Sequence, residues 1–231
     1  MIELRDLAFS YPDSDFGLSI TGLEIAAGTT TAFIGPSGSG KTTLLNLIAG
    51  ILEPDTGSVR TNGTLVTELS DRARRAFRVT EIGLVFQEFE LLEYLTVLDN
   101  ILLPYRINPV LKLQPEIEEW AKTLAARVGI TDKLRRRPRQ LSQGERQRVA
   151  VCRAVITDPP LLLTDEPTGN LDPLNRETVL DILFDYVRDA GTTLVSVTHD
   201  HGILERFEAV VDFRSFHDFG PDSGFQAAPA R

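Results

Sequence analysis

The sequence contains little cysteine and no long hydrophobic run, and each absence excludes a class of protein. A single cysteine among the 231 residues, Cys152, excludes an internal disulfide and fits a reducing compartment. It lies in the apolar run 149–152, which favours a small buried residue over a nucleophile. No stretch approaches the roughly 18–20 apolar residues of a membrane span, and the N-terminus is charged where a signal peptide is apolar. We therefore expect a cytoplasmic protein that acts at a membrane only through a partner.

An excess of positive charge is also absent, since 24 basic residues face 33 acidic ones and the net charge is −9. This balance argues against a nucleic-acid-binding protein, which needs a positive surface to neutralise phosphates. The one basic run consists of Lys133, Arg135, Arg136, Arg137 and Arg139. We favour a solvated helix end and loop over a nucleic-acid surface for this run, because it is short and isolated in an acidic chain.

The first third of the chain is typical of strands joined by turns. Residues 2–9 alternate in part between apolar and polar, and the apolar residues of 18–20 and 23–25 suggest a hairpin. A β-branched and aromatic run at 29–34 predicts a buried strand. The apolar stretch 44–49 predicts a helix that ends at Gly50.

The remaining chain predicts helices followed by a second group of strands. Residues 88–150 are rich in helix signals, including a helix that starts at Pro115 and continues to Val128. The last third contains a strand at 161–164, a helix from Asp172 to Gly191 and a strand at 193–198. Strand, helix and strand of these lengths imply a parallel sheet covered by helices.

Residues 35–42, Gly-Pro-Ser-Gly-Ser-Gly-Lys-Thr, match the P-loop pattern G-x-x-x-x-G-K-[ST] at each fixed position. The glycines allow backbone N–H groups to converge on phosphate oxygens, and the helix that follows presents its positive end. Lys41 is then placed to reach the β- and γ-phosphates, and Thr42 to coordinate Mg²⁺. The motif lies between a predicted strand and a predicted helix, so we expect nucleotide binding rather than a chance glycine-rich turn. The predicted phosphate-binding residues are Gly35, Pro36, Ser37, Gly38, Ser39, Gly40, Lys41, Thr42 and Thr43.

Further segments, in order along the chain, resemble the motifs of ATP-binding cassette (ABC) ATPases. They are Gln87 of the Q-loop, Leu-Ser-Gln-Gly-Glu at 141–145 for the signature motif, the Walker B segment 161–168, the D-loop 169–172 and the switch histidine His199, with Tyr11 where the family places an aromatic residue that stacks on adenine. The resemblance extends from about residue 2 to residue 210. Motifs in this order and at these spacings are far more specific than any one of them.

The resemblance implies an α/β fold, the P-loop NTPase fold of ABC ATPases. This fold has an N-terminal antiparallel β subdomain, a RecA-like, mainly parallel core sheet and a helical signature subdomain. We accordingly expect residues 1–219 to form a single ABC ATPase domain with its helical subdomain at about 88–150, and residues 220–231 to be a disordered tail.

The same resemblance assigns roles to the candidate catalytic residues. Asp165 holds Mg²⁺ directly or through water, and Glu166 is the general base that polarises the attacking water. His199 reaches the γ-phosphate, and Gln87 senses Mg²⁺ and the water and links the site to a transporter. Lys41 completes the catalytic set, and Thr42, Gln87 and Asp165 are the expected metal ligands.

Each of these residues has a simpler interpretation from sequence alone. Asp165 and Glu166 are also compatible with a solvated strand end, and a lone histidine such as His199 is most often structural. Tyr11 precedes Pro12 in a turn, where an aromatic side chain also packs against its neighbours. Their placement in family motifs favours the functional interpretation in each case.

The signature motif departs from the usual Leu-Ser-Gly-Gly-Gln at two positions. Gln143 replaces the first glycine and Glu145 replaces the glutamine, whereas Ser142 and Gly144 are kept. The family uses these two kept residues to touch the γ-phosphate bound by an opposite subunit. We therefore expect ATP and Mg²⁺ to be bound in a head-to-tail dimer, with a homodimer as the simplest form, and ATPase activity to be retained.

The expected partner is an integral membrane permease that seats near Gln87, on the segment 89–97 and the helical subdomain after it. The protein would then lie at the inner face of the membrane. The residues of the signature motif 141–145 and of the segment 166–172, together with the compact chain, resemble the ATPases of lipoprotein-releasing, macrolide-export and cell-division complexes. The alternatives are an importer ATPase, which usually carries a longer C-terminal domain, and a cassette protein of DNA repair or translation, which needs a second cassette, a coiled coil or a basic surface.

Overall fold

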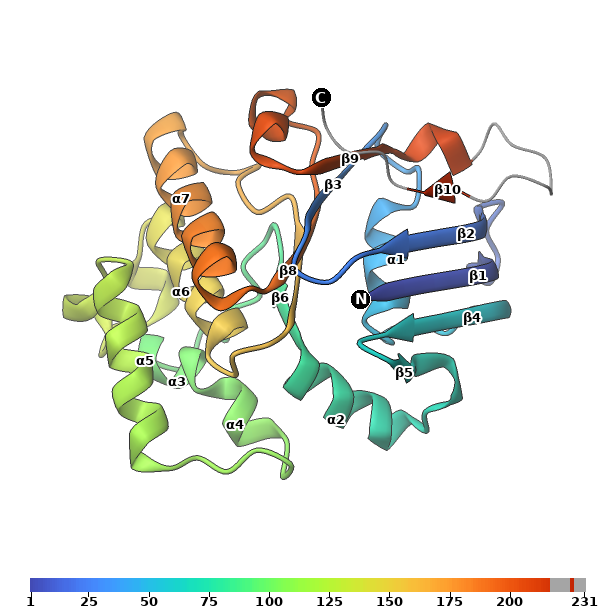
Figure 1. Ribbon diagram of the computed structural model, residues 1–231. Helices are drawn as coiled ribbons and strands as arrows, with labels where there is room; N and C mark the ends of the chain where they lie inside the picture. The colour runs from blue at the N-terminus through green and yellow to red at the C-terminus, as the bar shows by residue number, and fades with distance from the viewer. Residues whose placement is uncertain (217–224, 227–231) are drawn as a thin grey trace. The chain divides into compact units, whose positions relative to one another are not determined.

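The computed structural model describes residues 1–216 and 225–226 and contains both strands and helices (Figure 1). The strands are β1 (Ile2–Ser10), β2 (Gly17–Ile25), β3 (Thr30–Ile34), β4 (Thr56–Thr61), β5 (Thr64–Leu65), β6 (Ile82–Val85), β7 (Leu161–Asp165), β8 (Thr193–Val197), β9 (Ala209–Asp212) and β10 (Phe225–Gln226). The α-helices are α1 (Lys41–Ile48), α2 (Asp71–Glu81), α3 (Val97–Ile101), α4 (Leu103–Ile107), α5 (Pro115–Arg127), α6 (Gln143–Val155) and α7 (Pro173–Ala190). The expected α/β class is confirmed.

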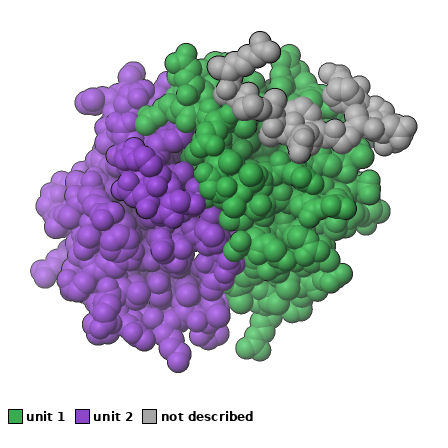
Figure 2. All heavy atoms as spheres, in the orientation of Figure 1, with its two compact units in different colours: residues 1–78, 193–231 green, residues 79–192 purple. Residues whose placement is uncertain are grey.

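The chain divides into two compact units, coloured separately in Figure 2. Unit 1 consists of residues 1–78 and 193–231, and unit 2 consists of residues 79–192. The tail for which we predict disorder lies outside the described residues, except for the two that form β10. The assignment of residues 1–219 to a single domain stays a prediction.

Unit 1 contains the expected antiparallel sheet, in the order β2-β1-β4-β5, to which β10 adds a short parallel pairing beside β2 (Figure 1). Its centre is β1, where Leu4 is paired with Leu23 of β2 on one side and with Val59 of β4 on the other. These three side chains are fully buried. Helix α1 packs beside β4, and the Thr61 hydroxyl donates a hydrogen bond to its last carbonyl, Ile48 O, at 3.3 Å.

The predicted hairpin between residues 18–20 and 23–25 is wrong, because both segments belong to the one strand β2. That strand pairs with β1 from Ile25 to Gly17, so the hairpin is formed by β1 and β2. The buried side chains of β2 change phase at Thr21–Gly22. A change of phase in an otherwise continuous strand has the same sequence pattern as a turn.

The phase change in β2 lies opposite a bulge in β1. Asp6 has a positive φ of 47°, and the register between β1 and β4 shifts between Arg5 and Ala8. Gly57 of β4 packs directly on this bulge, since a Cβ added there would lie 2.5 Å from the carbonyl oxygen of Arg5. With its φ of 83°, Gly57 is required on both steric and conformational grounds. The bulge explains why residues 2–9 alternate only in part.

Unit 1 also contains three parallel strands in the order β8-β3-β9. Phe33 of β3 pairs with Val197 of β8 and with Val211 of β9, and all three side chains are buried. The strands predicted at 29–34 and 193–198 are confirmed. Because these strands are parallel, the segments that leave their carboxyl ends emerge at one edge.

Unit 2 combines the parallel pair β6 and β7 with helices α3 to α7, as the helix-rich middle segment predicted. Helix α6 packs on β6 so closely that a Cβ added at Gly83 would meet the Ala154 carbonyl group. The predicted helices from Pro115 and from Asp172 are confirmed as α5 and α7. Helix α7 is capped by the Asp172 side chain at its start and ends at Gly191, whose φ is 65°.

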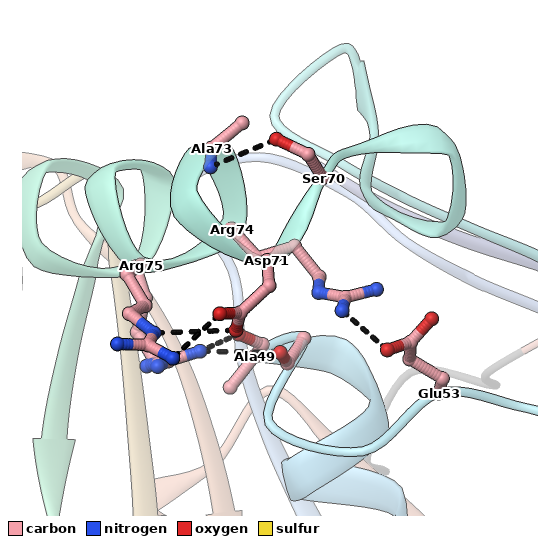
Figure 3. Close-up of polar contacts among 9 residues, drawn as sticks. Ala49, Glu53, Ser70, Asp71, Ala73, Arg74 and Arg75 are labelled. Atoms are coloured by element: carbon pink, nitrogen blue, oxygen red, sulfur yellow. Dashed lines mark hydrogen bonds and ion pairs between the residues drawn. The ribbon is translucent and has the colours of Figure 1, made fainter.

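Helix α2 was not predicted, because its apolar side is narrow and arginine occupies much of its length. Polar contacts within unit 1 hold it instead (Figure 3). Arg74 is ion-paired with Glu53, and Arg75 with Asp71 one turn earlier. Arg78 donates to the carbonyl oxygens of Ala49 and Gly50 at 3.4 and 3.1 Å. Ala49 and Gly50 directly follow the last residue of α1. At this C-terminal end the helix dipole favours a cation.

None of the helices in residues 1–216 has the length and apolar character needed to cross a membrane. The one cysteine, Cys152, is fully buried on α6. Burial raises the pKa of its thiol to about 12, which leaves almost no thiolate at neutral pH. The interpretation of Cys152 as a packed hydrophobic residue is therefore confirmed.

We predict that native protein does not react with Ellman's reagent at pH 8. The reagent requires an accessible thiolate, whereas the Cys152 thiol is buried in the folded protein and remains protonated. Addition of denaturing urea releases one reactive thiol per chain, as expected for the single free cysteine. Rapid labelling of the native protein would show that α6 opens far more readily than its packing suggests.

Candidate functional site

The predicted site residues divide between the two units. Unit 1 carries Tyr11, the P-loop residues 35–43 and His199. Unit 2 carries Gln87, the signature motif 141–145 and the Walker B and D-loop residues 161–172. In each unit, part of the predicted set lies in loops at the carboxyl ends of parallel strands: the P-loop and His199 in unit 1, and Gln87 and the Walker B and D-loop residues in unit 2.

The P-loop connects the end of β3 to the start of α1, as predicted. Lys41 is the first residue of α1, and its side chain folds back across the loop. Its ammonium donates to the carbonyl oxygens of Gly35 and Pro36, both at 2.8 Å. The side chain is only 8% exposed, so the charge is held at the inner side of the loop. This places a fixed cation beside the positive end of a helix, a combination that favours a bound phosphate.

Three glycines give the P-loop its shape, each with a positive φ. A Cβ at Gly35 would lie 2.9 Å from Phe213 Cβ, and one at Gly40 would lie 2.8 Å from Phe16 Cζ. Gly38 has a φ of 79° but no heavy atom within 4 Å of an added Cβ. The loop is thus packed at its two ends and open at its middle. The open side, lined by backbone groups, fits phosphate oxygens.

Tyr11 lies beside the start of α1. Its hydroxyl is 3.1 Å from the Thr43 hydroxyl, and its ring contacts Phe9 edge-on at a centroid distance of 4.8 Å and Phe16 at 5.6 Å. The side chain is 38% exposed, so one part of the ring is packed and another faces outward. This position next to the P-loop agrees with both interpretations of Tyr11, packing and base stacking.

His199 lies in the segment that leaves β8, the neighbour of β3. The Thr198 N–H donates to the Phe33 carbonyl oxygen at 3.1 Å, which brings this segment to the carboxyl end of β3, where the P-loop begins. His199 is exposed, and Asp200 after it caps a short 3-10 turn by accepting from the Gly202 N–H. A packed structural role for the His199 ring is not supported by this exposure.

Gln87 follows β6, and Asp165 is the last residue of the neighbouring strand β7. Val85 of β6 pairs with Thr164 of β7, so the next residues of both strands emerge at the same edge. Asn170 of the D-loop donates its amide to the Gln87 carbonyl oxygen at 3.4 Å. Carboxylate, amide and hydroxyl oxygens are the ligands that Mg²⁺ prefers, so Asp165, Gln87 and Thr42 are chemically suited to it. Among the described residues, there is no cluster of three or more His, Cys, Asp or Glu side chains that could hold a metal ion.

Glu166 has a strained backbone, with a φ of 47°. The turn is closed by a hydrogen bond from the Gly169 N–H to the Glu166 carbonyl oxygen at 3.1 Å. It is also tied to α6, because Gln147 donates its side-chain amide to the Pro167 carbonyl oxygen at 2.7 Å. Gln147 is 0% exposed. The sequence analysis missed this residue, although a glutamine on the buried side of a helix is a signal for a specific polar contact.

The signature motif starts helix α6 with a reciprocal cap. The Ser142 hydroxyl accepts from the Glu145 N–H at 3.2 Å, and the Glu145 carboxylate accepts from the Ser142 N–H at 2.8 Å. Burial acts to raise the pKa of Glu145, but the bond from Ser142 and the nearby Lys133 ammonium hold it below its usual range. Glu145 therefore departs from the usual glutamine in charge but serves as the third-position partner of a capping box. Gln143 is exposed in the first turn.

Gly144 is buried against the start of α7. A Cβ added there would lie 2.5 Å from Cγ and 3.0 Å from Cβ of Asn175. Asn175 is itself fixed, because its Oδ1 accepts from Arg148 at 3.2 Å and its Nδ2 donates to Asp172 at 2.6 Å. The contact joins the signature helix to the helix that follows the D-loop, and no sequence pattern indicated Asn175.

Comparison with known proteins gives a consistent family assignment. Residues 18–169 match the family described as ABC transporter. An uncharacterised ABC transporter ATP-binding protein of Mycobacterium tuberculosis is 40% identical over 93% of this chain and 87% of its own length. The lipoprotein-releasing system ATP-binding protein LolD 1 of Rhodopirellula baltica is 40% identical over 91% of this chain and 94% of its own length. LolD of Bacteroides thetaiotaomicron is 43% identical over 79% and 83%, respectively.

Solved structures agree with these relatives. The dimeric structure of MJ0796, a bacterial ABC transporter cassette, matches with a TM-score of 0.82 at 31% identity and covers 92% of this chain and 94% of its own. A dimeric post-hydrolysis state of the same cassette, bound to ADP and Pi, matches with a TM-score of 0.79 over the same shares. The expected α/β cassette fold is thereby confirmed.

We predict that Gly144→Ala lowers stability by about 1–3 kcal/mol, the usual cost of inserting a methyl group into a packed contact. The added Cβ overlaps Asn175, which its two hydrogen bonds hold in place. In the Asn175→Ala background the same Gly144→Ala change costs less in thermal unfolding, because the overlap with Cγ of Asn175 is gone and only the Cβ, 3.0 Å away, remains. Gln143→Ala, an exposed neighbour, serves as the control. A Gly144→Ala protein as stable as wild type would contradict the close contact between α6 and α7.

Proposed function

The chain belongs to the ABC transporter family, and from this premise we propose that it hydrolyses ATP within a head-to-tail dimer that drives a separate membrane permease. Its activity is that of an ATP hydrolase. Each residue of the candidate site has a distinct role in hydrolysis, in the dimer or in contact with the partner. The structural features that support each role lie within unit 1 or within unit 2.

Unit 1 binds the triphosphate. The backbone of the open P-loop segment around Gly38 and the Lys41 ammonium hold the β- and γ-phosphates, and the dipole of α1 favours their charge. Tyr11, partly exposed beside the loop, stacks on adenine. His199, exposed at the end of β8, donates to the γ-phosphate as charge develops there.

Unit 2 supplies the proton chemistry. Asp165 and Gln87, at the shared edge of β6 and β7, provide oxygen ligands for Mg²⁺, which would neutralise phosphate charge when bound. Thr42 of unit 1 carries a hydroxyl of the same ligand type. Glu166 accepts the proton of the attacking water as general base. Its constrained turn fixes the point at which the side chain leaves the backbone, and positioning of this kind favours general-base catalysis.

The dimer completes each site with the signature motif of the opposite subunit. Ser142 is exposed at the first turn of α6, and the N-terminus of that helix carries the positive charge that suits a phosphate. Structures of the MJ0796 cassette are dimeric, and one contains ADP and Pi. By analogy we assign Ser142 and Gly144 to the γ-phosphate of the partner, in a homodimer with two equal sites.

The partner is a permease in the membrane. Two relatives are named as the ATP-binding proteins of a lipoprotein-releasing system, which is consistent with a subunit that works with other components. Docking in the region of Gln87 would place the protein at the inner face of the membrane. The side chain of Tyr94, in the segment 89–97, is 70% exposed and available for such a contact. Among the transporter classes, these relatives favour the lipoprotein-releasing type over an importer or a non-transport cassette protein.

The observation that carries the proposed mechanism is the Walker B turn of unit 2. A glutamate with a positive φ follows a buried parallel strand, and its turn is fixed by an internal hydrogen bond and by Gln147. Strain of this kind, held by surrounding contacts, gathers at functional sites. A solvated strand end requires no such support.

We predict that Glu166→Gln lowers ATP turnover by about 10²- to 10⁴-fold, the contribution of a general base. The amide keeps the shape of the side chain but cannot accept the proton. ATP therefore stays bound, and the protein elutes as a dimer in size-exclusion chromatography with Mg²⁺ and ATP. Steady-state phosphate release and the elution volume are the two measurements.

Glu116→Gln is the matched control, since Glu116 is exposed in the first turn of α5. It should hydrolyse ATP like wild type. If Glu166→Gln keeps its turnover, Glu166 is not the base. If turnover is lost but the protein stays monomeric with ATP bound, the isolated subunit does not form the proposed dimer.

A further inference from the structure

Arg153 of α6 reaches the loop that contains Gln87 and binds its backbone at two points. Its Nη2 donates to the Phe89 carbonyl oxygen at 2.7 Å, and its Nη1 donates to the Glu90 carbonyl oxygen. All of these residues belong to unit 2. One guanidinium thus clamps two successive carbonyl groups, the fork geometry to which arginine is suited and lysine is not.

The clamped residues have an unfavourable backbone. Phe89 has a φ of 63° and Glu90 a φ of 48°, so two consecutive non-glycine residues lie in the left-handed region. Local hydrogen bonds are few: the Phe89 N–H donates to Phe86 O at 3.2 Å and the Glu90 N–H to Glu88 O at 2.7 Å. Such a conformation persists only where neighbouring groups hold it.

The guanidinium depends on the loop in turn. Burial lowers the pKa of Arg153 to about 10, although the charge of Glu90 opposes this shift. The group is still charged at neutral pH, and a charge held away from water needs hydrogen-bond partners. The two carbonyl oxygens supply them, so the clamp and the strained loop stabilise each other.

Gln87 lies between this clamp and a second contact. Its own carbonyl oxygen accepts from Asn170 of the D-loop, and the clamp begins two residues later. We propose that Arg153 is a positioning residue: by holding Phe89 and Glu90 in the left-handed conformation, it sets where Gln87 stands and links it to the signature helix. This inference rests on the proposed role of Gln87 in hydrolysis.

Through Arg153, helix α6 connects the signature motif to the backbone near Gln87. Helix α6 starts at the signature motif, so a displacement of that motif by a partner's nucleotide is carried along α6 to Arg153. The clamp then moves the backbone near Gln87 within the same subunit. Closure of the dimer and placement of Gln87 become one event.

The test compares Arg153→Met and Arg153→Lys in the full chain. Loss of the clamp lowers kcat by about tenfold or more, the usual effect of removing the support of a metal-site residue. KM for ATP changes less than about twofold, because the P-loop of unit 1 sets binding. Arg153→Lys keeps the positive charge but cannot bind both carbonyl groups, so it tests the clamp even if Arg153→Met does not fold. Arg188→Met, an exposed arginine of α7, is the matched control and keeps wild-type turnover.

A second substitution separates positioning from general destabilisation. Glycine adopts a positive φ without strain, whereas alanine does not. Glu90→Gly in the Arg153→Lys background therefore restores a measurable part of kcat, and Glu90→Ala, which removes the same charge, does not. Thermal unfolding of each variant shows that the recovery is not a change in the folded fraction.

Gln87→Ala completes the comparison. Arg153 acts through Gln87, so Arg153→Lys costs little further kcat in the Gln87→Ala background. The inference is overturned if both Arg153 variants, folded, keep wild-type kcat, if Glu90→Ala rescues as well as Glu90→Gly, or if the effects of Arg153 and Gln87 simply multiply. If Gln87→Ala alone keeps full turnover, the proposed role of Gln87 fails and the inference with it, while loss of turnover in Glu166→Gln still supports the ATPase mechanism.

Discussion

Positive φ angles in the segments after three of the parallel strands, β3, β6 and β7, are the constraint on which much of the candidate site depends. After β3, glycine meets this requirement with little strain, and Gly35, Gly38 and Gly40 shape the P-loop. After β6 and β7, the chain makes similar turns with Phe89, Glu90 and Glu166, residues for which the conformation is sterically strained. These positions carry or adjoin side chains with proposed chemical roles. Glycine at 166 would remove the proposed base itself, so the strain must be supported from outside the turn.

Helix α6 provides that support in unit 2. Its buried side bears polar residues where an ordinary amphipathic helix has only apolar ones. Gln147 holds the Pro167 carbonyl, and Arg153 holds the carbonyls after Gln87. At its start, Gly144 leaves room for Asn175 of α7. The signature helix therefore contacts the loop after each parallel strand of unit 2 and the helix after the D-loop. A single rigid element with these contacts can transmit a change at one loop to the others.

Sequence reasoning located the motifs but not the contacts between them. The P-loop between a strand and a helix, the start of α7 at Asp172 and the strands β7 and β8 all follow from local patterns. The structure has these elements, and β7 extends one residue further than predicted, to Asp165. Local sequence patterns do not predict the structure where it depends on a contact with a residue distant in the sequence. The phase change of β2 reflects the bulge at Asp6, so it was misread as a turn. Helix α2 is held by ion pairs and by hydrogen bonds to the carbonyl groups after α1. The spacing of hydrophobic residues gives no signal for such polar contacts.

The departures in the signature motif illustrate the same distinction. Compared with the usual motif, Glu145 introduces a charge next to a phosphate-binding segment, which would be repulsive if that charge pointed toward the phosphate. Instead the carboxylate is turned back onto the Ser142 N–H and lies 3.5 Å from the Lys133 ammonium. The Ser142 hydroxyl accepts one hydrogen bond from the Glu145 N–H, and a hydroxyl group still has its own proton to donate. The cap thus fixes Ser142 while leaving that proton for the proposed bond to a phosphate oxygen. Because the cap and the phosphate use different parts of one hydroxyl group, the departure at position 145 is compatible with the dimer that the motif requires.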